Sequence, residues 1–309
     1  FTGHANDLFE PTDFPVQLQD LMAEAAAVIT VSDYTAGWLA ERFPESRCKI
    51  QRVYNGIDML SFPLVERKGG DASEPLVVSV GRLIEKKGFD DLIRSVARIR
   101  DIYDQPFRVL IIGDGPMKEE LECLIEELKC GENIKLAGSR NQSEIVKILS
   151  SATIFALPCV TEEGGGKDNL PTVIMEAMAT GLPCVSTRLA GVPEMVIHDS
   201  TGLLTDERSP EDFADTLVTL LSNRALCHQM GMAGHERAAT IFAKEITARD
   251  LVRRLVAYGK LRLDVGLMLK YPILGACYFV QWWRRLLRLL TPRGKGKFAA
   301  IQQERKVRG

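Results

Sequence analysis

The sequence predicts an α/β protein whose main part is a doubly wound parallel sheet, preceded by part of a second α/β domain and followed by a helical extension. Between residues 75 and 205, short apolar runs alternate with longer amphipathic stretches, the pattern of strands joined by crossover helices. The run at 76–80 is almost wholly apolar, as expected for a strand covered on both faces. The first 62 residues repeat the alternation but are too few to enclose a complete core of this kind.

Residues 1–62 are therefore expected to form the later part of an α/β domain. Their predicted elements alternate between helix and strand: helix 14–26, strand 28–31, a helix that starts at Ser32, and strand 49–53. Asn55-Gly56 is a turn signal, and the polar, glycine-containing stretch at 69–73 indicates a connection. We place the linker between the two domains at residues 63–74.

Residues 75–240 are expected to form the complete doubly wound domain. The predicted elements alternate along the chain: strand 76–80, helix 89–102, strand 107–112, helix 116–129, strand 133–137, helix 142–150, strand 152–157, helix 171–180 and strand 184–186. A further helix is expected after Ser209, with that residue as its N-cap and Pro210 at its first position. Ligands of such sheets bind at the carboxyl ends of the strands, so the loops at that edge are the candidate site.

The stretch at 158–181 is the centre of the predicted site, because a glycine-rich loop leaves a buried strand there and opens a helix. Pro171 suits the first helical position, and Gly181 suits a left-handed residue just after the helix end. The first amides of a helix have no partner within the helix and attract anions. The glycines at 164–166 let a ligand approach the backbone closely. This arrangement suits an anionic ligand.

Four charged residues refine that prediction. Asp168 lies just before the helix and Glu176 lies inside it, so the two could hold separate hydroxyl-bearing parts of an extended ligand. Arg82 and Lys87 follow the strand at 76–80, where a guanidinium and an ammonium can both pair with phosphate. Together they fit a nucleotide sugar, which has hydroxyls at each end and a diphosphate between them. The alternative is an ordinary surface loop with two solvated cations.

Several strings resemble those of the GT4 family of retaining glycosyltransferases, which have the GT-B fold. Asp168, seven intervening residues and Glu176 are followed by Ala-Met-Ala-x-Gly-x-Pro, although the family more often has Glu at the first position. Gly81-Arg82-Leu83 followed by Lys87-Gly88 resembles the family's donor-phosphate motif, and His4-Ala5-Asn6-Asp7 resembles the string around its active-site histidine. The first half of the family's N-terminal domain has no counterpart here, so we expect a fragment.

The resemblance implies a role for each matching residue. His4 and Asp168 would be catalytic residues close to the donor sugar. The remaining contacts to the donor would divide between Arg82, Lys87, Asn169 and Leu170 for the diphosphate, Glu176 for the ribose, and the backbone at Gly138 and Ser139 for the base. Glu194 is a minor candidate. The sequence has no Asp-x-Asp motif, so we infer no catalytic metal, and the donor itself is the one small molecule implied.

Composition sets the broad class. The 309 residues are 46% apolar and 26% charged, an ordinary composition for a globular protein. No signal peptide is evident at the start. Seven scattered cysteines without a C-x-x-C pair indicate reduced thiols, in place of a disulfide framework or a zinc site. We therefore expect a cytoplasmic protein.

The end of the chain differs from the rest. Residues 241–263 are predicted to be the helix that crosses back to the N-terminal domain, as the resemblance implies. Residues 264–309 form a basic amphipathic tail: 259–309 hold twelve Lys/Arg and two acids, so the remainder carries a net charge of −12. Within 271–290, an apolar helical stripe faces away from arginines, which suits the surface of an anionic membrane at its cytoplasmic face. The alternative is a helix packed on the body, and no motif supports nucleic-acid binding.

These observations predict a retaining glycosyltransferase that moves a sugar from a nucleotide diphosphate to a glycan or lipid-linked acceptor in polysaccharide or glycoconjugate biosynthesis. Two alternatives stay open. One is a catalytically silent nucleotide-sugar-binding or scaffold protein at the membrane. The other is a sugar-nucleotide epimerase of related fold, which would isomerise the donor without transferring it.

Overall fold

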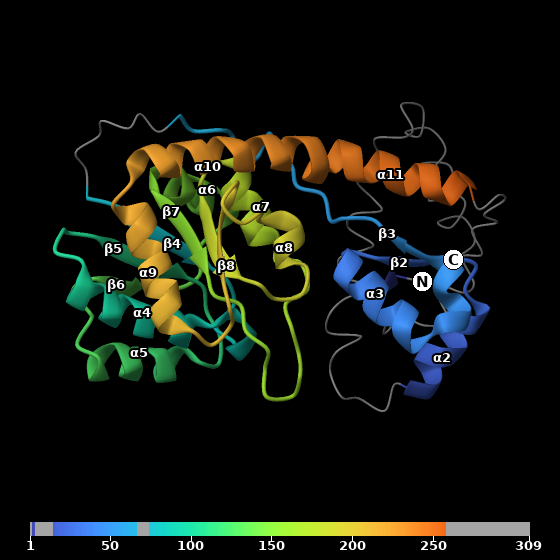
Figure 1. Ribbon diagram of the computed structural model, residues 1–309, viewed down its shortest axis with the longest axis horizontal. Coiled ribbons are helices and arrows are strands. Elements are labelled where there is room, and N and C mark those ends of the chain that lie inside the picture. The colour runs from blue at the N-terminus through green and yellow to red at the C-terminus, as the bar shows by residue number, and fades with distance from the viewer. Residues whose placement is uncertain (1, 4–14, 67–73, 258–309) are drawn as a thin grey trace, which may run out of the picture. The chain divides into compact units, whose positions relative to one another are not determined.

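A six-stranded, all-parallel sheet forms the centre of the computed structural model, which describes residues 2–3, 15–66 and 74–257 (Figure 1). Its strands are β4 (Leu76–Val80), β5 (Arg108–Ile112), β6 (Ile134–Leu136), β7 (Ile154–Leu157), β8 (Cys184–Thr187) and β9 (Gly202–Thr205). Their order across the sheet is β6-β5-β4-β7-β8-β9. This is the 3-2-1-4-5-6 order of doubly wound folds. The direction in which successive strands are added to the sheet reverses between β4 and β7. The predicted fold class is confirmed.

Helices cover both faces of this sheet (Figure 1). On one face α4 packs against α5 and α9, and on the other α7 packs against α10, with α6 beside β4. Their bounds are α4 (Phe89–Ile102), α5 (Lys118–Glu127), α6 (Gln142–Ser151), α7 (Thr172–Ala179), α8 (Val192–Met195), α9 (Pro210–Leu221) and α10 (Arg224–Arg237). Because both faces are covered, every residue of β7 and β8 is buried.

A second, three-stranded parallel sheet lies in the N-terminal part. Its elements are β1 (Thr2–Gly3), α2 (Pro15–Glu24), β2 (Val28–Thr30), α3 (Asp33–Arg42), the 3-10 helix η1 (Pro44–Lys49) and β3 (Ile50–Arg52). It has a small apolar cluster of its own, formed by Leu18, Met22, Val28, Leu39 and Phe43. The predicted linker at 63–74 falls between the two sheets, and its middle, 67–73, lies outside the described residues. The exact domain boundaries stay a prediction.

Two of the four predicted helix-end residues have the expected role, and two do not. The Ser32 side chain accepts from the Thr35 N–H at 3.1 Å and so caps α3, as predicted. Gly181 has a φ of +76° just after α7. Pro171 was expected inside the helix but lies one residue before it, because its ψ of 107° is extended. Ser209 precedes α9 but makes no capping bond; its hydroxyl instead donates to the Glu207 carbonyl.

The last described segment passes beside the chain that joins the two sheets. After α10, a π-helical turn (η3, Ala238–Phe242) leads into α11 (Lys244–Ala257). The Ile57 N–H donates to the Phe242 carbonyl, the Lys244 N–H donates to the Ile57 carbonyl, and the Arg254 side chain donates to Gln51 on β3. A helix that returns to the N-terminal sheet was predicted for 241–263. The tail at 264–309 lies outside the described residues.

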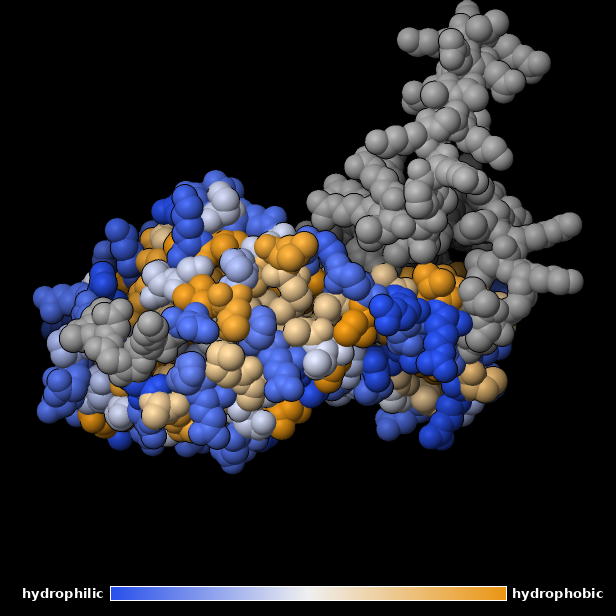
Figure 2. Space-filling model, turned by 90° about the horizontal axis from the view of Figure 1, so that it is seen from above, coloured by the Kyte–Doolittle hydropathy of each residue, from blue (hydrophilic) through white to orange (hydrophobic). Residues whose placement is uncertain are grey.

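Within the described ranges, no helix is both long and apolar enough to cross a bilayer. On the face seen in Figure 2, hydrophobic residues are interspersed with hydrophilic ones over the described part of the chain. Six described cysteines are free thiols: Cys48, Cys123, Cys130, Cys159, Cys184 and Cys227. The seventh, Cys277, lies outside the described residues.

Candidate functional site

The loops that follow β4 and β7 meet at the point where the strand order reverses. Gly88 has a φ of +64°, and a Cβ atom there would lie 1.9 Å from the carbonyl oxygen of Pro158. The Val160 N–H donates to the Lys86 carbonyl at 3.1 Å. These contacts bring residues 81–88 and the glycine-rich loop, residues 158–171, together at the carboxyl edge of the sheet. Open α/β sheets bind their ligands at this kind of position.

Arg82 and Lys87 lie in the first of these loops, as the sequence predicted. The Arg82 side chain is exposed, and no described residue forms an ion pair or hydrogen bond with it. Lys87 ends a 3-10 turn, η2 (Glu85–Lys87), and its ammonium forms a short ion pair with the Asp168 carboxylate. Burial works against the charge on Lys87, but the facing Asp168 outweighs it and the pKa of the ammonium is raised.

The sequence does not predict that Lys87 pairs with Asp168, because we expect the two residues to bind different parts of a ligand. Both side chains are largely buried, with relative exposures of 13% and 20%. The fully buried Cys159 lies nearby, and burial, with a contribution from Asp168, raises the pKa of its thiol to about 12. The thiol is therefore neutral, which leaves Asp168 as the partner that balances the lysine.

The end of the glycine-rich loop presents free backbone amides. The N–H groups of Asn169 and Leu170, just before α7, have no acceptor among the described residues. The Asn169 side chain is buried, where its Oδ1 accepts from the Ser32 hydroxyl at 2.6 Å while its Nδ2 has no described partner. The first turn of α7 adds the orphan amides that every helix start carries. An anion at this position would meet several unpaired donors.

Glu176 lies one and a half turns into α7. Its carboxylate forms no hydrogen bond or ion pair with a described residue, and burial alone raises its pKa to about 7. A partly buried carboxylate without a partner is costly for the fold, so it points to a ligand that supplies hydrogen-bond donors.

The remaining predicted residues do not all lie at the candidate site. Gly138 and Ser139 follow β6 at the same edge of the sheet, and the Gly138 carbonyl accepts from the Gly113 N–H at 3.1 Å. His4 lies outside the described residues. Glu194 has a structural role: its two carboxylate oxygens accept from the Asp33 and Tyr34 amides at 2.8 Å each, at the start of α3.

Sequence reasoning missed a group of polar contacts around Thr161. Its N–H and hydroxyl both donate to Glu207, in the loop after β9, and Arg208 joins the same group. Arg208 has a φ of +58°, which nothing in the sequence indicated, since glycine and asparagine are the usual residues there. Over the described part of the chain, no group of three or more His, Cys, Asp or Glu side chains is placed to hold a metal ion.

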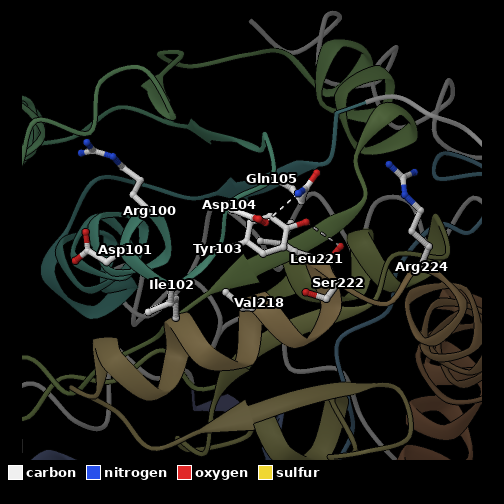
Figure 3. A pocket seen from close by; sticks show the side chains of 10 residues that line it. All are labelled: Arg100, Asp101, Ile102, Tyr103, Asp104, Gln105, Val218, Leu221, Ser222 and Arg224. Carbon is white, nitrogen blue, oxygen red and sulfur yellow. Dashed lines mark hydrogen bonds between the residues drawn. The ribbon is translucent and has the colours of Figure 1, made fainter.

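A separate surface hollow of about 820 Å³ lies at the opposite, amino edge of the sheet (Figure 3). Its lining comes from the end of α4, the loop before β5, the end of α9 and the start of α10. Tyr103 closes part of it by donating to the Leu221 carbonyl, and Arg100 and Arg224 lie at either side (Figure 3). The hollow contains none of the residues predicted to bind a ligand.

Comparison with known proteins identifies the family. The model of the family called glycosyl transferases group 1 matches residues 64–237, more than half of the chain and the whole of the candidate site except His4. The chain belongs to this family. Its six-stranded sheet and the loops after β4 and β7 are thus parts of a group 1 glycosyltransferase domain, and the GT-B fold expected from the resemblance is confirmed.

Two curated relatives have names that refer to different products. The amylovoran biosynthesis glycosyltransferase AmsK of Erwinia amylovora is 33% identical over 213 residues, which are 69% of this chain and 51% of the relative. The GDP-mannose-dependent alpha-(1-6)-phosphatidylinositol monomannoside mannosyltransferase of Mycobacterium tuberculosis is 35% identical over 164 residues, 52% of this chain and 42% of that protein. The chain spans about half the length of these relatives.

Solved structures show the same fold at low identity. HepE (Alr3699) of Anabaena, solved in complex with UDP and glucose, has a TM-score of 0.69 and 20% identity, and the match covers 83% of this chain and 71% of HepE. TarM of S. aureus, solved as a mutant with UDP and other ligands, has a TM-score of 0.68 and 17% identity over 84% of this chain and 50% of TarM.

Proposed function

We propose that this chain is the donor-binding part of a retaining glycosyltransferase that transfers a sugar from a nucleotide diphosphate to a glycan or lipid-linked acceptor. One observation carries the proposal. At the reversal point of the sheet, two cations, a set of unpaired amides and an unpaired acidic side chain lie along the same edge. Their order suits the diphosphate and ribose of one extended ligand.

The diphosphate would lie between Arg82, Lys87 and the amides of Asn169 and Leu170. Lys87 is already charged and fixed by Asp168, so a phosphate can take over part of its hydrogen bonding without reorganising the loop. As the ammonium turns toward phosphate, the Asp168 carboxylate becomes free to accept from hydroxyls of the donor sugar. The Lys87–Asp168 pair would therefore prepare both residues for the donor.

Glu176 would receive the two ribose hydroxyls in its ionised form. Those hydroxyls replace the water that burial has removed from the carboxylate. The base would extend toward Gly138 and Ser139. His4 would lie at the reacting sugar, as the resemblance implies.

In the reaction, the bond between the sugar's anomeric carbon and the phosphate oxygen breaks, and a bond from the same carbon to the acceptor oxygen forms on the same face. The departing diphosphate takes the proton of the acceptor hydroxyl. Arg82 and Lys87 stabilise the negative charge that develops on the phosphate. The proposal requires no metal ion, because these two cations and the helix amides neutralise that charge.

The names of two relatives, which refer to amylovoran and a phosphatidylinositol mannoside, support the proposed acceptor class. A cytoplasmic enzyme that uses such an acceptor would work at the membrane surface. The basic segment at 271–290 is the part of the sequence proposed for that contact.

A thermal-shift screen with UDP, GDP, ADP and their sugars tests donor binding, because a ligand specific to the folded state raises Tm. We expect one nucleotide class to raise it, and Arg82→Ala to abolish the rise. Absence of any shift across the panel would reject the proposal. Release of nucleotide diphosphate by the full gene product would then separate an enzyme from a silent binding protein, and an isomerised donor would indicate an epimerase.

A further inference from the structure

We propose that Glu207 and Arg208, in the loop after β9, are positioning residues that hold the first half of the glycine-rich loop in the shape that receives the donor. The inference rests on the proposed function. Neither residue reaches the free amides at the end of that loop, so each would act through the residues it contacts. The loop after β9 would thus set donor affinity without touching the donor.

Glu207 fixes Thr161 at two points. The Thr161 N–H donates to Glu207 Oε2 at 2.6 Å, and the Thr161 hydroxyl donates to Oε1 at 3.1 Å. A residue held by its backbone and its side chain at once cannot rotate freely. Thr161 follows the three buried residues that open the glycine-rich loop, 158–160, so its orientation influences the direction of the exposed residues that follow.

Arg208 connects Thr161 to the loop that carries Arg82 and Lys87, the cations proposed to bind the donor diphosphate. Its guanidinium donates to Glu85 Oε1 at 2.7 Å and to the Thr161 carbonyl at 3.3 Å. Glu85 in turn accepts from the Glu163 N–H at 3.2 Å, and a second Arg208 nitrogen lies 3.5 Å from Asp90. Glu85 belongs to η2, the turn that ends at Lys87, so one side chain connects both sides of the donor site.

Other contacts of this half involve Lys86: its ammonium lies 3.8 Å from the Glu162 carboxylate, and its carbonyl accepts from the Val160 N–H at 3.1 Å. Gly164 and Gly165 are exposed, with open space where a Cβ would lie, and such residues are conformationally free unless anchored. The loop closes on itself through the Glu162 N–H to Gly166 and the Gly165 N–H to Glu162. Those bonds fix its internal shape, whereas Glu207 and Arg208, together with the Lys86–Glu162 ion pair, fix its orientation on the sheet.

The cost of Arg208 to the fold argues against a purely stabilising role. A non-glycine residue at a φ of +58° is strained. The Arg208 and Glu85 side chains are 42% and 38% exposed, and ion pairs that exposed contribute little stability. A strained arginine with weak pairing but three directed contacts fits a residue that orients its neighbours.

The decisive variant is Arg208→Gly, which relieves the strained backbone while removing the guanidinium. The matched control is Lys129→Gly, because Lys129 also has a positive φ, of +52°, and lies after α5 away from the site. We expect equal or higher Tm in both variants. In Arg208→Gly alone, we expect affinity for the nucleotide diphosphate that binds best among UDP, GDP and ADP to fall about tenfold, as for the loss of directed hydrogen bonds. Glu207→Gln, which removes one acceptor for Thr161, should weaken binding in the same direction.

A second readout needs no ligand. Cleavage after the exposed Glu163 by endoproteinase Glu-C should be faster in Arg208→Gly than in the wild-type chain or Lys129→Gly. If the wild-type chain binds a nucleotide, and Arg208→Gly shows either the wild-type rate of cleavage or the wild-type nucleotide affinity, the positioning role alone is overturned. Weaker binding together with a Tm below that of Lys129→Gly would also overturn it, as general destabilisation. A wild-type chain that binds none of the three nucleotides would reject the proposed function, and this inference with it.

Discussion

The ionised Glu176 carboxylate is expected to destabilise the unliganded fold but to bind the ligand. The Glu176→Gln variant tests both effects. Burial raises the pKa of its carboxyl from an ordinary value of 4.5 to about 7, with no charged neighbour contributing. Because the folded chain holds this proton more tightly than the unfolded chain, stability falls as pH rises from about 4.5 to about 7 and then levels off. Glutamine has the same shape and no charge to bury, so the variant should lack this loss.

The magnitude follows from the two pKa values. A difference of about 2.5 pKa units corresponds to at most about 3 kcal/mol at pH 8, and to about 1 kcal/mol at pH 5. Glu176 is partly accessible to solvent, so we expect the smaller part of that range. For a chain of this size, 1 kcal/mol corresponds to a Tm change of about 2–4 °C. Glu176→Gln should therefore raise Tm by several degrees at pH 8 and by less at pH 5.

The assay is thermal unfolding at pH 5, 6, 7 and 8, paired with titration of the nucleotide diphosphate. Glu120→Gln, at an exposed position of α5, is the matched control and should change neither quantity. In the wild type, nucleotide affinity should fall about tenfold between pH 8 and pH 6, because the ionised form accepts the ribose hydroxyls. Equal Tm gains at pH 5 and pH 8, or full nucleotide affinity in Glu176→Gln, would refute the reasoning.

The other predictions concern the loops and the tail. Gly88→Ala should cost several kcal/mol in chemical denaturation, because its Cβ would collide with the Pro158 carbonyl, whereas Gly165→Ala, with open space around it, should cost about 1 kcal/mol; equal costs would contradict the close contact of the two loops. Lys87→Met should lower the free energy of unfolding by about 3 kcal/mol, because it leaves the largely buried Asp168 carboxylate without its partner. Adding Asp168→Asn should restore part of that stability but no nucleotide affinity. A single Lys87→Met variant as stable as the wild type would contradict the pairing. Truncation after residue 263 should abolish flotation of the chain with anionic liposomes, and equal flotation of both forms would remove the tail from the proposal.

The sequence was informative where local chemistry decides the structure. The apolar run at 76–80 became β4 and the amphipathic run at 89–102 became α4, with the predicted bounds. Ser32 capped its helix because a hydroxyl next to a helix start can satisfy an amide three residues on. Ser209 had the same local signal but did not cap, since its hydroxyl found the Glu207 carbonyl instead.

The features that local patterns could not predict depend on distant partners. Lys87 and Asp168 are 81 positions apart, and their pairing appears only when the loops after β4 and β7 meet. The raised pKa of Glu176 depends on how deeply α7 is packed, which spacing does not report. Arg208 adopts a backbone conformation that its residue type disfavours, so its contacts with Thr161 and Glu85 had no signal in the sequence.

The most direct test is a crystal structure of the chain with the nucleotide diphosphate that stabilises it most. Our account predicts the diphosphate between Arg82, Lys87 and the amides before α7, the ribose at Glu176, and Lys87 turned away from Asp168. A nucleotide found elsewhere, for example in the hollow beside Arg100 and Arg224, with the Lys87–Asp168 pair intact, would contradict it.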